Sequence, residues 1–437
     1  MPMTLDRAIA GQLETSHSGY RDRTLDAARA CMLVTAASLP FSTAATNVFT
    51  ALALFFWAIS GQWRATLRAI AAEPAAWMGC VLLAALCAGI AWSRAPLVDA
   101  LGAVAKYREL VLFGITMFLF TDARWRMRLL WVFLASALAL LIASYAIQWG
   151  LFQHSDSRGF SSRQNAVLMK NHITHGFIMS LLAGGAIIVA QRATGWQRWA
   201  MGLVAALAAA NVWFAVQGRT GYVVMGAVLL WLAYARWSIR GLAAATAGLA
   251  LLLAVAWQWA PAFQMRVGQA MVEAQDLEAR DYGAQHAPGE MAIRIRLHYW
   301  KRSLEWLAQR PVLGAGTGAW GEAFYEATVD DPPFMHDRAH QHPHNEYVLL
   351  AVQLGPTGAL LFIALLTTAF RRARQLPPIE AELARGLVIA FATGCLFNDF
   401  LWDMTEGHIW AVLGGALFGA SRALAQSGAE RAPLGLA

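Results

Sequence analysis

The sequence is poor in charged residues. Only 14% of its 437 residues are charged, whereas 58% are hydrophobic, and the mean hydropathy is +0.44. Because a soluble domain of ordinary composition carries about 25% charged residues, this composition excludes that class. It predicts an all-α polytopic membrane protein instead.

Cysteine is also scarce. Cys31, Cys80, Cys87 and Cys395 all lie in apolar runs and show no CxxC spacing, which excludes a disulfide framework and a thiolate metal site. The segment 1–29 is polar and lacks the apolar centre of a signal peptide, so we expect the first apolar run to remain as an anchor.

Long apolar runs dominate the rest of the chain. They lie at about 30–60, 75–93, 101–120, 128–149, 172–191, 199–216, 220–235, 241–260, 345–370, 385–400 and 407–424. Several approach the roughly 20 residues that cross a bilayer. The first run is long enough for two helices divided by a turn at 40–43, so we predict about twelve transmembrane helices.

Basic residues occupy every second loop between these runs. They are Arg64 and Arg68; Arg124, Arg126 and Arg128; Arg192 and Arg198; Arg236 and Arg240; and Arg371, Arg372, Arg374 and Arg385. The positive-inside rule makes these loops and both termini cytoplasmic. The net charge of +7 then reflects topology and attraction to anionic membrane lipids, and it gives no argument for nucleic acid.

These expectations define five segments. They are a cytoplasmic tail (1–29), nine transmembrane helices (30–260), a large outer loop (261–343), three further transmembrane helices (344–424) and a cytoplasmic tail (425–437).

The outer loop is predicted to be partly helical. An apolar stripe at helical spacing is formed by Ile293, Leu297, Trp300, Leu304 and Leu307. Arg310-Pro311 should end this helix. The glycine-rich segment 314–318 reads as a flexible turn, because no Lys-Ser/Thr follows to make it a phosphate loop.

Histidines are concentrated at the end of this loop. His336, His340, His342 and His344 lie within nine residues. With Asp337 they could form a metal site, or they could simply face water. On the helix expected for the following run, His344, Gly355 and Gly358 share one face. An imidazole of ordinary pKa near 6.5 can accept a proton from a hydroxyl group.

Several cations are candidate ligands for an anionic substrate. Arg219 lies in a tight turn between two apolar runs, where an arginine can also simply reach the interface. Arg294 and Arg296 lie in the predicted outer helix, two residues apart, so they point to different sides; the alternative for Arg294 is a solvated charge. Further candidates on the outer face are Lys106, Arg108, Arg163, Lys170 and Asn171.

Three motifs resemble those of the O-antigen ligase family, within a superfamily shared with O-antigen polymerases and protein O-oligosaccharyltransferases. The first is His344-Asn345, nine residues, Gly355, two residues and Gly358. The second is the turn Gly218-Arg219-Thr220-Gly221. The third is Arg296, three residues and Trp300, followed by Pro311-Val312-Leu313-Gly314-Ala315-Gly316.

The resemblance implies a GT-C-like glycosyltransferase of the bacterial inner membrane that needs no metal or cofactor. The donor would be O-antigen linked to undecaprenyl diphosphate, and the acceptor a hydroxyl group of the lipid A-core oligosaccharide at the periplasmic face. His344 would act as general base and Arg219 and Arg296 would contact the pyrophosphate. Asn345 would orient the imidazole or a sugar, and Asn171 matches an asparagine of related proteins.

Other interpretations remain open. A protein O-oligosaccharyltransferase or an O-antigen polymerase would use the same donor, and a transporter or flippase would bind the lipid diphosphate without chemistry. Trp320 and Tyr325 are candidates for stacking against sugars, and Asp399, Asp403 and Glu406 for helix capping or sugar binding.

Overall fold

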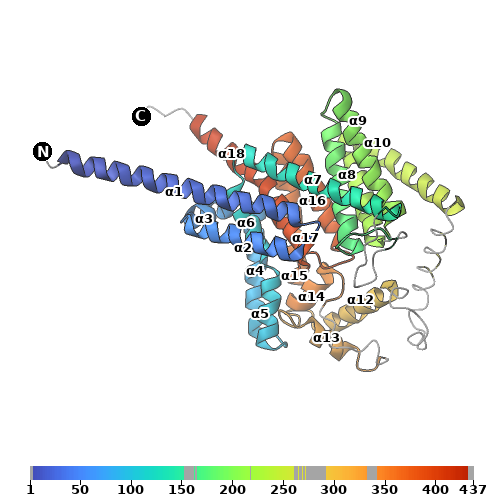
Figure 1. The fold of residues 1–437 in the computed structure, drawn as a ribbon. Coiled ribbons are helices and arrows are strands. Elements are labelled where there is room, and N and C mark those ends of the chain that lie inside the picture. Colours follow the sequence, from blue (N-terminus) through green and yellow to red (C-terminus); the bar gives the residue numbers. More distant parts are fainter. Residues whose placement is uncertain are drawn as a thin grey trace.

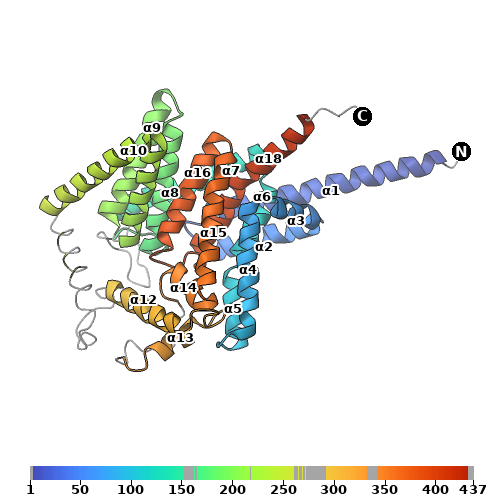
Figure 2. The same ribbon diagram turned by 180° about the vertical axis from the view of Figure 1, so that it is seen from behind.

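The computed structural model describes residues 3–151, 162, 165–216, 218–259, 264, 268, 271, 292–331 and 342–431. Within these ranges the chain is helical, and extended pairing is confined to a bridge between Ser162 and Asn165. Figures 1 and 2 show the helices from opposite sides, with α5 and α12 to α14 gathered at one end. Arg163, His336, Asp337 and His340 lie outside the described residues.

The first helices confirm the predicted turn near Pro40. Residues 3–88 form α1 (Met3–Ser38), α2 (Thr43–Ile59), α3 (Trp63–Ala72) and α4 (Pro74–Ala88). Ser42 caps α2 by accepting a hydrogen bond from the Ala45 amide at 3.1 Å. Helix α1 runs through the expected boundary at residue 30, and α2 and α3 meet at a bend of 106°.

In the middle of the chain, one continuous apolar run forms two helices instead of one. This part of the chain forms η1 (Gly89–Trp92), α5 (Leu97–Lys106), α6 (Glu109–Leu119), α7 (Ala123–Gln148), α8 (His172–Ala190), α9 (Gly195–Ala210) and the π-helical turn η2 (Asn211–Ala215). The run expected at 101–120 is divided at Tyr107 and Arg108, where α5 ends and α6 begins.

Helix α10 (Arg219–Trp259) reverses direction within its length. Ser238 has φ 54° and ψ −145°, which is not helical. A Cβ built on Gly226 would lie 3.8 Å from the Leu249 side chain, so the two halves lie side by side. The two apolar runs expected at 220–235 and 241–260 are therefore separate helical arms.

The C-terminal part contains a second break within an apolar run. It forms α12 (Ala292–Gln309), α13 (Trp320–Ala327), α14 (Glu346–Leu354), α15 (Pro356–Arg372), η5 (Ala373–Gln375), α16 (Pro378–Gly394), α17 (Met404–Ile409), the π-helical turn η6 (Trp410–Gly414) and α18 (Gly415–Arg431). His344 precedes α14, and Gly355 separates α14 from α15. The expectation that His344, Gly355 and Gly358 share one helix face is wrong, because no single helix contains them.

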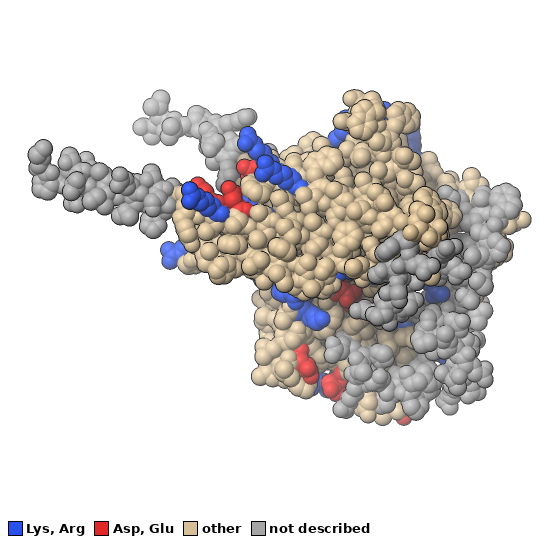
Figure 3. Space-filling model, viewed as in Figure 1, with Lys and Arg blue, Asp and Glu red and all other residues tan. Residues whose placement is uncertain are grey.

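The helices are those of a membrane protein. Five described helices are long and apolar enough to cross a bilayer, or six if the bent pair α2 and α3 forms one span. The twelve spans expected from the runs are not confirmed, because breaks divide several runs into shorter helices. In Figure 3, charged side chains lie above and below a broad uncharged band.

The predicted outer helix forms as α12 and ends just before Arg310. Its buried face differs from the expected stripe, since Leu304 is 52% exposed whereas Tyr299, Ser303 and Trp306 are buried. The aromatic rings explain this choice. Tyr299 packs against Trp320 with ring centroids 5.6 Å apart, and the buried area of aromatic rings outweighs that of a single leucine.

Close helix packing brings the Arg219 turn to the beginning of α8. A Cβ on Gly176 would lie 2.8 Å from Gly221 Cα, and a Cβ on Gly218 would lie 2.9 Å from the His172 carbonyl oxygen. Glycine at these positions lets the backbones approach. The N-terminal ends of α8 and α10 are therefore adjacent.

Candidate functional site

Two of the sequence motifs pack directly against each other. Ala315 and Gly316 donate backbone hydrogen bonds to the carbonyl oxygens of Val352 (2.7 Å) and Gln353 (2.9 Å) at the end of α14. Gly355 adopts φ 68°, and a Cβ there would lie 2.1 Å from the Val312 carbonyl oxygen. Segment 314–318 is thus a packed clamp rather than a flexible turn, and both motifs position the loop that carries His344.

The His344 loop is held at both ends. Asn345 caps α14 by accepting hydrogen bonds from the amides of Tyr347 (3.0 Å) and Val348 (3.1 Å), and its side-chain amide donates to the Leu396 carbonyl oxygen. Trp300 donates to the Pro343 carbonyl oxygen at 2.9 Å. His344 itself has φ 56°. A non-glycine residue in this region costs about 1–3 kcal/mol and persists only where its surroundings hold it.

The imidazole of His344 is oriented by Asn398 rather than by the expected Asn345. The Asn398 side-chain oxygen lies 3.1 Å from His344 Nδ1. The His344 ring also lies nearly parallel to that of Tyr299, with centroids 6.4 Å apart and planes 20° apart. These contacts fix the direction of the ring.

His344 is neutral at physiological pH. Burial and the charges of His342 and Arg296 lower the pKa of His344, whereas Asp399 and the hydrogen bond with Asn398 oppose them, and the net pKa is about 4. The site therefore holds an imidazole with a free lone pair on one nitrogen, which is the form that accepts a proton.

His342 forms a contrasting pair with Asp399. Its Nδ1 lies 2.6 Å from the buried carboxylate of Asp399, and the rings of His342 and His344 meet edge to face at 4.6 Å. Burial opposes the cationic form of His342, but the hydrogen bond and charge of Asp399 outweigh it and raise the pKa of His342. The two adjacent histidines thus favour different protonation states.

Hydrogen bonds to the buried Glu346 hold segment 398–403 in place. This buried carboxyl group accepts hydrogen bonds from the Leu401 amide at 2.9 Å and from the Tyr107 hydroxyl group at 3.1 Å. The other oxygen of Asp399 accepts from the Asn345 amide at 2.9 Å. The segment that orients both histidines is therefore part of the core.

Arg219 acts electrostatically on Arg296, and Arg296 acts on His344. Burial lowers the pKa of Arg296, and the like charge of Arg219 lowers it further while Asp399 opposes. Arg296 in turn lowers the pKa of His344. Arg296 therefore interacts electrostatically with both Arg219 and His344, and it links the three predicted catalytic side chains. Their catalytic roles remain predictions.

Arg294 belongs to a different group. It is 3% exposed, so the alternative of a solvated charge is wrong. Burial lowers the pKa of His298, and Arg302 and Arg294 lower it further while Asp331 opposes, which places Arg294 near His298. Its contact with a substrate remains a prediction.

Two further candidates lie beside segment 402–405. Lys106 is exposed and lies over the Trp402 ring at 5.7 Å. Lys170 donates to Thr43 (2.7 Å) and Thr405 (3.0 Å) hydroxyl groups; burial lowers the pKa of Lys170, and Glu406 opposes.

Two candidates have structural partners nearby. Asn171 caps α8 by accepting from the Thr174 amide at 2.8 Å. The exposed Arg108 lies 3.4 Å from the carboxylate of Glu109. Substrate contacts by Lys106, Lys170, Asn171 and Arg108 therefore remain predictions.

A metal ion could be held by the same loop. One ligand atom from each of His342, His344 and Asp399 lies within 4.8 Å of the others. Three such ligands fit a catalytic zinc site. However, Nδ1 of His342 already faces Asp399, and Nδ1 of His344 already faces Asn398. An ion would therefore need to bind the Nε2 atoms.

Sequence reasoning missed Asn398 as an orienting group and misassigned Trp320. Trp320 is 1% exposed and donates to the Ser303 hydroxyl group at 3.0 Å, so the expectation that it stacks against sugars is wrong. The clustering of polar residues between two apolar runs, Asn398, Asp399 and Asp403, was the available signal for the missed group. Tyr325 is half-buried, and its role remains a prediction.

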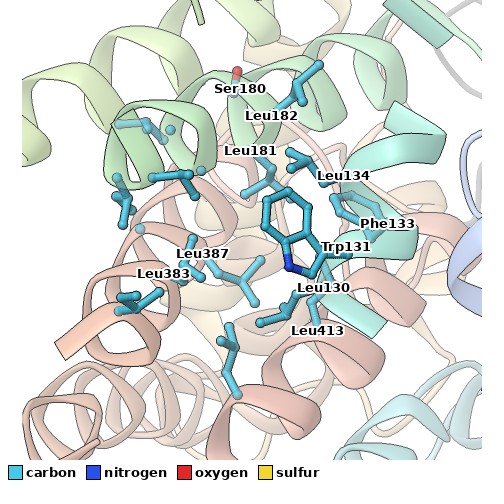
Figure 4. Close-up of a pocket in the computed structure, with 18 of the residues that line it drawn as sticks. Leu130, Trp131, Phe133, Leu134, Ser180, Leu181, Leu182, Leu383, Leu387 and Leu413 are labelled. Carbon is cyan, nitrogen blue, oxygen red and sulfur yellow. The ribbon is translucent and has the colours of Figure 1, made fainter. Parts of the chain in front are cut away.

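An apolar cavity of about 110 Å³ lies among α7, α8, α10, α16 and the C-terminal helices. Figure 4 shows Trp131, Leu181 and Leu387 pointing into it. Ser180 is the polar residue of the described lining, and its hydroxyl group donates to the Gly176 carbonyl oxygen. Because this lining contains no titratable side chain, the cavity cannot supply acid-base chemistry.

The fold and the site thus define a helical membrane protein with a neutral histidine beside half-buried cations. Residues 203–363 match the family model for O-antigen ligase. The match includes Arg219, Arg296, His344, Gly355 and Gly358, and it indicates a glycosyltransferase-like protein of the ligase or polymerase type. No curated protein matches the chain.

Proposed function

We propose that this protein is an O-antigen ligase that completes lipopolysaccharide. It moves O-antigen from undecaprenyl diphosphate to a hydroxyl group of the lipid A-core oligosaccharide. The reaction takes place at the periplasmic face of the bacterial inner membrane, with both termini in the cytoplasm. The arginines between the apolar runs support this orientation.

The observation that carries the proposal is the pairing of a neutral imidazole with two half-buried cations. His344 has a pKa of about 4 and lies within the charge field of Arg296, which is itself close to Arg219. A neutral base can take a proton from the acceptor, and the adjacent cations can stabilise a departing anion. The pairing therefore suits a reaction that needs both.

The proposed reaction is a single displacement. His344 takes the proton of the acceptor hydroxyl group as its oxygen attacks the anomeric carbon. The bond from that carbon to the diphosphate oxygen breaks, and its electron pair leaves with undecaprenyl diphosphate. Arg219 and Arg296 neutralise the leaving group, because a guanidinium forms two parallel hydrogen bonds to phosphate oxygens. Direct attack inverts the anomeric configuration.

Donor binding makes the histidine a better base. A pKa of about 4 keeps His344 neutral but makes it a weak base in the empty site. A bound diphosphate adds negative charge beside Arg296 and His344, which favours the imidazolium form and raises the pKa of His344. The base therefore strengthens when the substrate arrives.

The first test removes the base. We expect His344→Ala to lower glycan transfer by about 100-fold or more, since a positioned general base contributes about 10²–10⁴-fold. Transfer is measured with purified protein in detergent, lipid-linked O-antigen and core lipopolysaccharide. Donor binding should persist because both arginines remain, and full transfer by His344→Ala would refute the assignment.

The second test removes the cations. We expect Arg219→Ala and Arg296→Ala each to weaken donor binding by about 10- to 100-fold, because a hydrogen bond to a charged group contributes about 1.5–3 kcal/mol. Arg310→Ala is the matched control. Arg310 follows α12 and pairs with Glu326, about 21 Å along the helix from Arg296. If the control weakens donor binding equally, the arginines act only through net charge.

The third test addresses the metal alternative. We expect EDTA to leave transfer unchanged, because fixed cations already neutralise the leaving group. Loss of transfer that zinc restores would assign His342, His344 and Asp399 to a metal site instead.

The acceptor is tested by competition among three substrates. One lipid-linked glycan is offered to core lipopolysaccharide, to a pilin-like protein and to a second lipid-linked glycan. Transfer to the core supports the ligase proposal. Transfer to protein or to the second glycan would assign the chain to oligosaccharyltransferases or polymerases, which use the same donor.

A further inference from the structure

A side-chain relay lies behind the imidazole of His344. Asn398 is 4% exposed and is located between α16 and α17. Its side-chain oxygen lies 3.1 Å from His344 Nδ1, and its side-chain nitrogen donates to the Asp403 carboxyl group at 2.6 Å. Asn398 thus connects the proposed base to the half-buried side chain of Asp403.

The relay determines which ring nitrogen carries the proton. An amide oxygen can only accept a hydrogen bond, so the contact with Asn398 requires a hydrogen on Nδ1 of His344. The lone pair is then on Nε2. If the amide were flipped, its nitrogen would donate to Nδ1, the hydrogen would move to Nε2, and Nε2 could not accept a proton.

Asp403 faces the nitrogen end of this amide. Burial and the charges of Glu406 and Asp399 raise the pKa of Asp403 to about 8, and a protonated carboxyl group still keeps an oxygen that accepts a hydrogen bond. The Asp403 oxygen accepts from the Asn398 side-chain nitrogen, so the opposite end of the amide must present oxygen to His344. The relay is not required to form the local turn, because the Asn398 backbone amide separately donates to the Gly394 carbonyl oxygen at 3.0 Å. The side chain is therefore available for a role in the site.

We propose that Asn398 and Asp403 are positioning residues that hold His344 in the tautomer whose Nε2 takes the proton of the acceptor hydroxyl group. The inference rests on the proposed function, since it assigns a role to groups behind the proposed base. Neither residue touches the reacting atoms in this arrangement, and both act through the imidazole.

The kinetic test removes the relay without removing the base. We expect Asn398→Leu to lower kcat by about 100-fold, close to the loss of the base itself, while KM for the donor changes by less than about twofold. Asn47→Leu, at an exposed position of α2, is the matched control and should retain full kcat. Unchanged kcat in Asn398→Leu would overturn the proposal.

A double substitution distinguishes the relay from a structural role. The single variant Asn398→Asp places two carboxyl groups about 2.6 Å apart. The single variant Asp403→Asn lets the Asn398 amide flip. We expect each single variant to lower kcat. The combined variant Asn398→Asp/Asp403→Asn restores the pattern, because the carboxylate accepts from Nδ1 and from the new amide. We expect it to recover at least tenfold over either single variant, and no recovery would contradict the relay.

A spectroscopic measurement is independent of activity and leaves Asn398 and Asp403 unchanged. Nitrogen-15 NMR of the histidine-labelled wild-type protein separates a protonated Nδ1 from a protonated Nε2, and the His344 signal is identified by its loss in His344→Ala. We expect protonation at Nδ1, and protonation at Nε2 overturns the relay. If His344→Ala retains transfer, the proposed function fails, whereas the NMR result still judges the tautomer.

Discussion

The low pKa of His344 predicts an unusual acid limit for the proposed reaction. The groups that act on this imidazole are His342, Asp399, Arg296 and Asn398. Since kcat/KM reports the free enzyme, it should fall to half at a pH of about 4. At pH 5, about nine-tenths of the base would be neutral, against about 3% for an ordinary histidine of pKa near 6.5. The two cases differ by about 30-fold at this pH.

The measurement is a profile of transfer between pH 4 and pH 7 at low donor concentration. In the same experiment, kcat at saturating donor should fall at a higher pH than kcat/KM does, because the bound diphosphate raises the pKa of His344. His342→Ala should move the kcat/KM limit upward, since His342 lowers the pKa of His344.

Stability must be controlled in this range. The pKa of His344 is depressed by folding, so its contribution to stability is complete above about pH 6.5 and is lost as the pH falls toward 4. The loss at pH 4 is about 3 kcal/mol. Activity that returns after readjustment to pH 7 shows that the limit is catalytic. A half-point of kcat/KM near 6.5 in folded protein would refute the reasoning.

Three further predictions concern the framework of the site. Gly355→Ala should lower the free energy of unfolding by at least about 2 kcal/mol in a denaturation assay, because φ is 68° and the new Cβ would meet the Val312 carbonyl oxygen; an unchanged midpoint would show that the clamp can yield. Trp320→Ala should cost about 3–5 kcal/mol through loss of buried packing, whereas a loss of sugar binding with stability intact would restore the stacking hypothesis. Asp399→Asn should lower the pKa of His342, measured by NMR titration, because Asp399 is the group that raises it; no shift would contradict the pairing.

Local breaks explain why the number of spans could not be predicted from hydropathy. Leucine and alanine continue on both sides of Gly355, so the run at 345–370 resembles one helix. The break lies at Gly355, with φ 68°, and at Pro356, which has no N–H to continue α14. Ala315 and Gly316 also hydrogen-bond to the end of α14, a contact between residues about 40 positions apart. Tyr107 similarly ends α5 while its hydroxyl group binds Glu346.

The site was predicted in part. The motifs around Arg219, Arg296 and His344 were recognisable because glycine, arginine and histidine occur there at fixed spacing, and the structure brings their side chains into one charge field. The motif predicted that Asn345 orients the imidazole or a sugar. In the structure, Asn345 caps α14 instead. A capping asparagine and an orienting asparagine look identical in sequence.

The amino-acid sequence by itself determined that this protein is helical and lies in a membrane, because composition and apolar run length depend only on which residues follow one another. It also determined the match to the family model, since residues 203–363 carry its motifs. Only the tertiary structure decided that His344 is neutral and which group orients it. Burial, the nearby cations and the contact with Asn398 come from segments distant in the chain, and their effect depends on distance rather than on order.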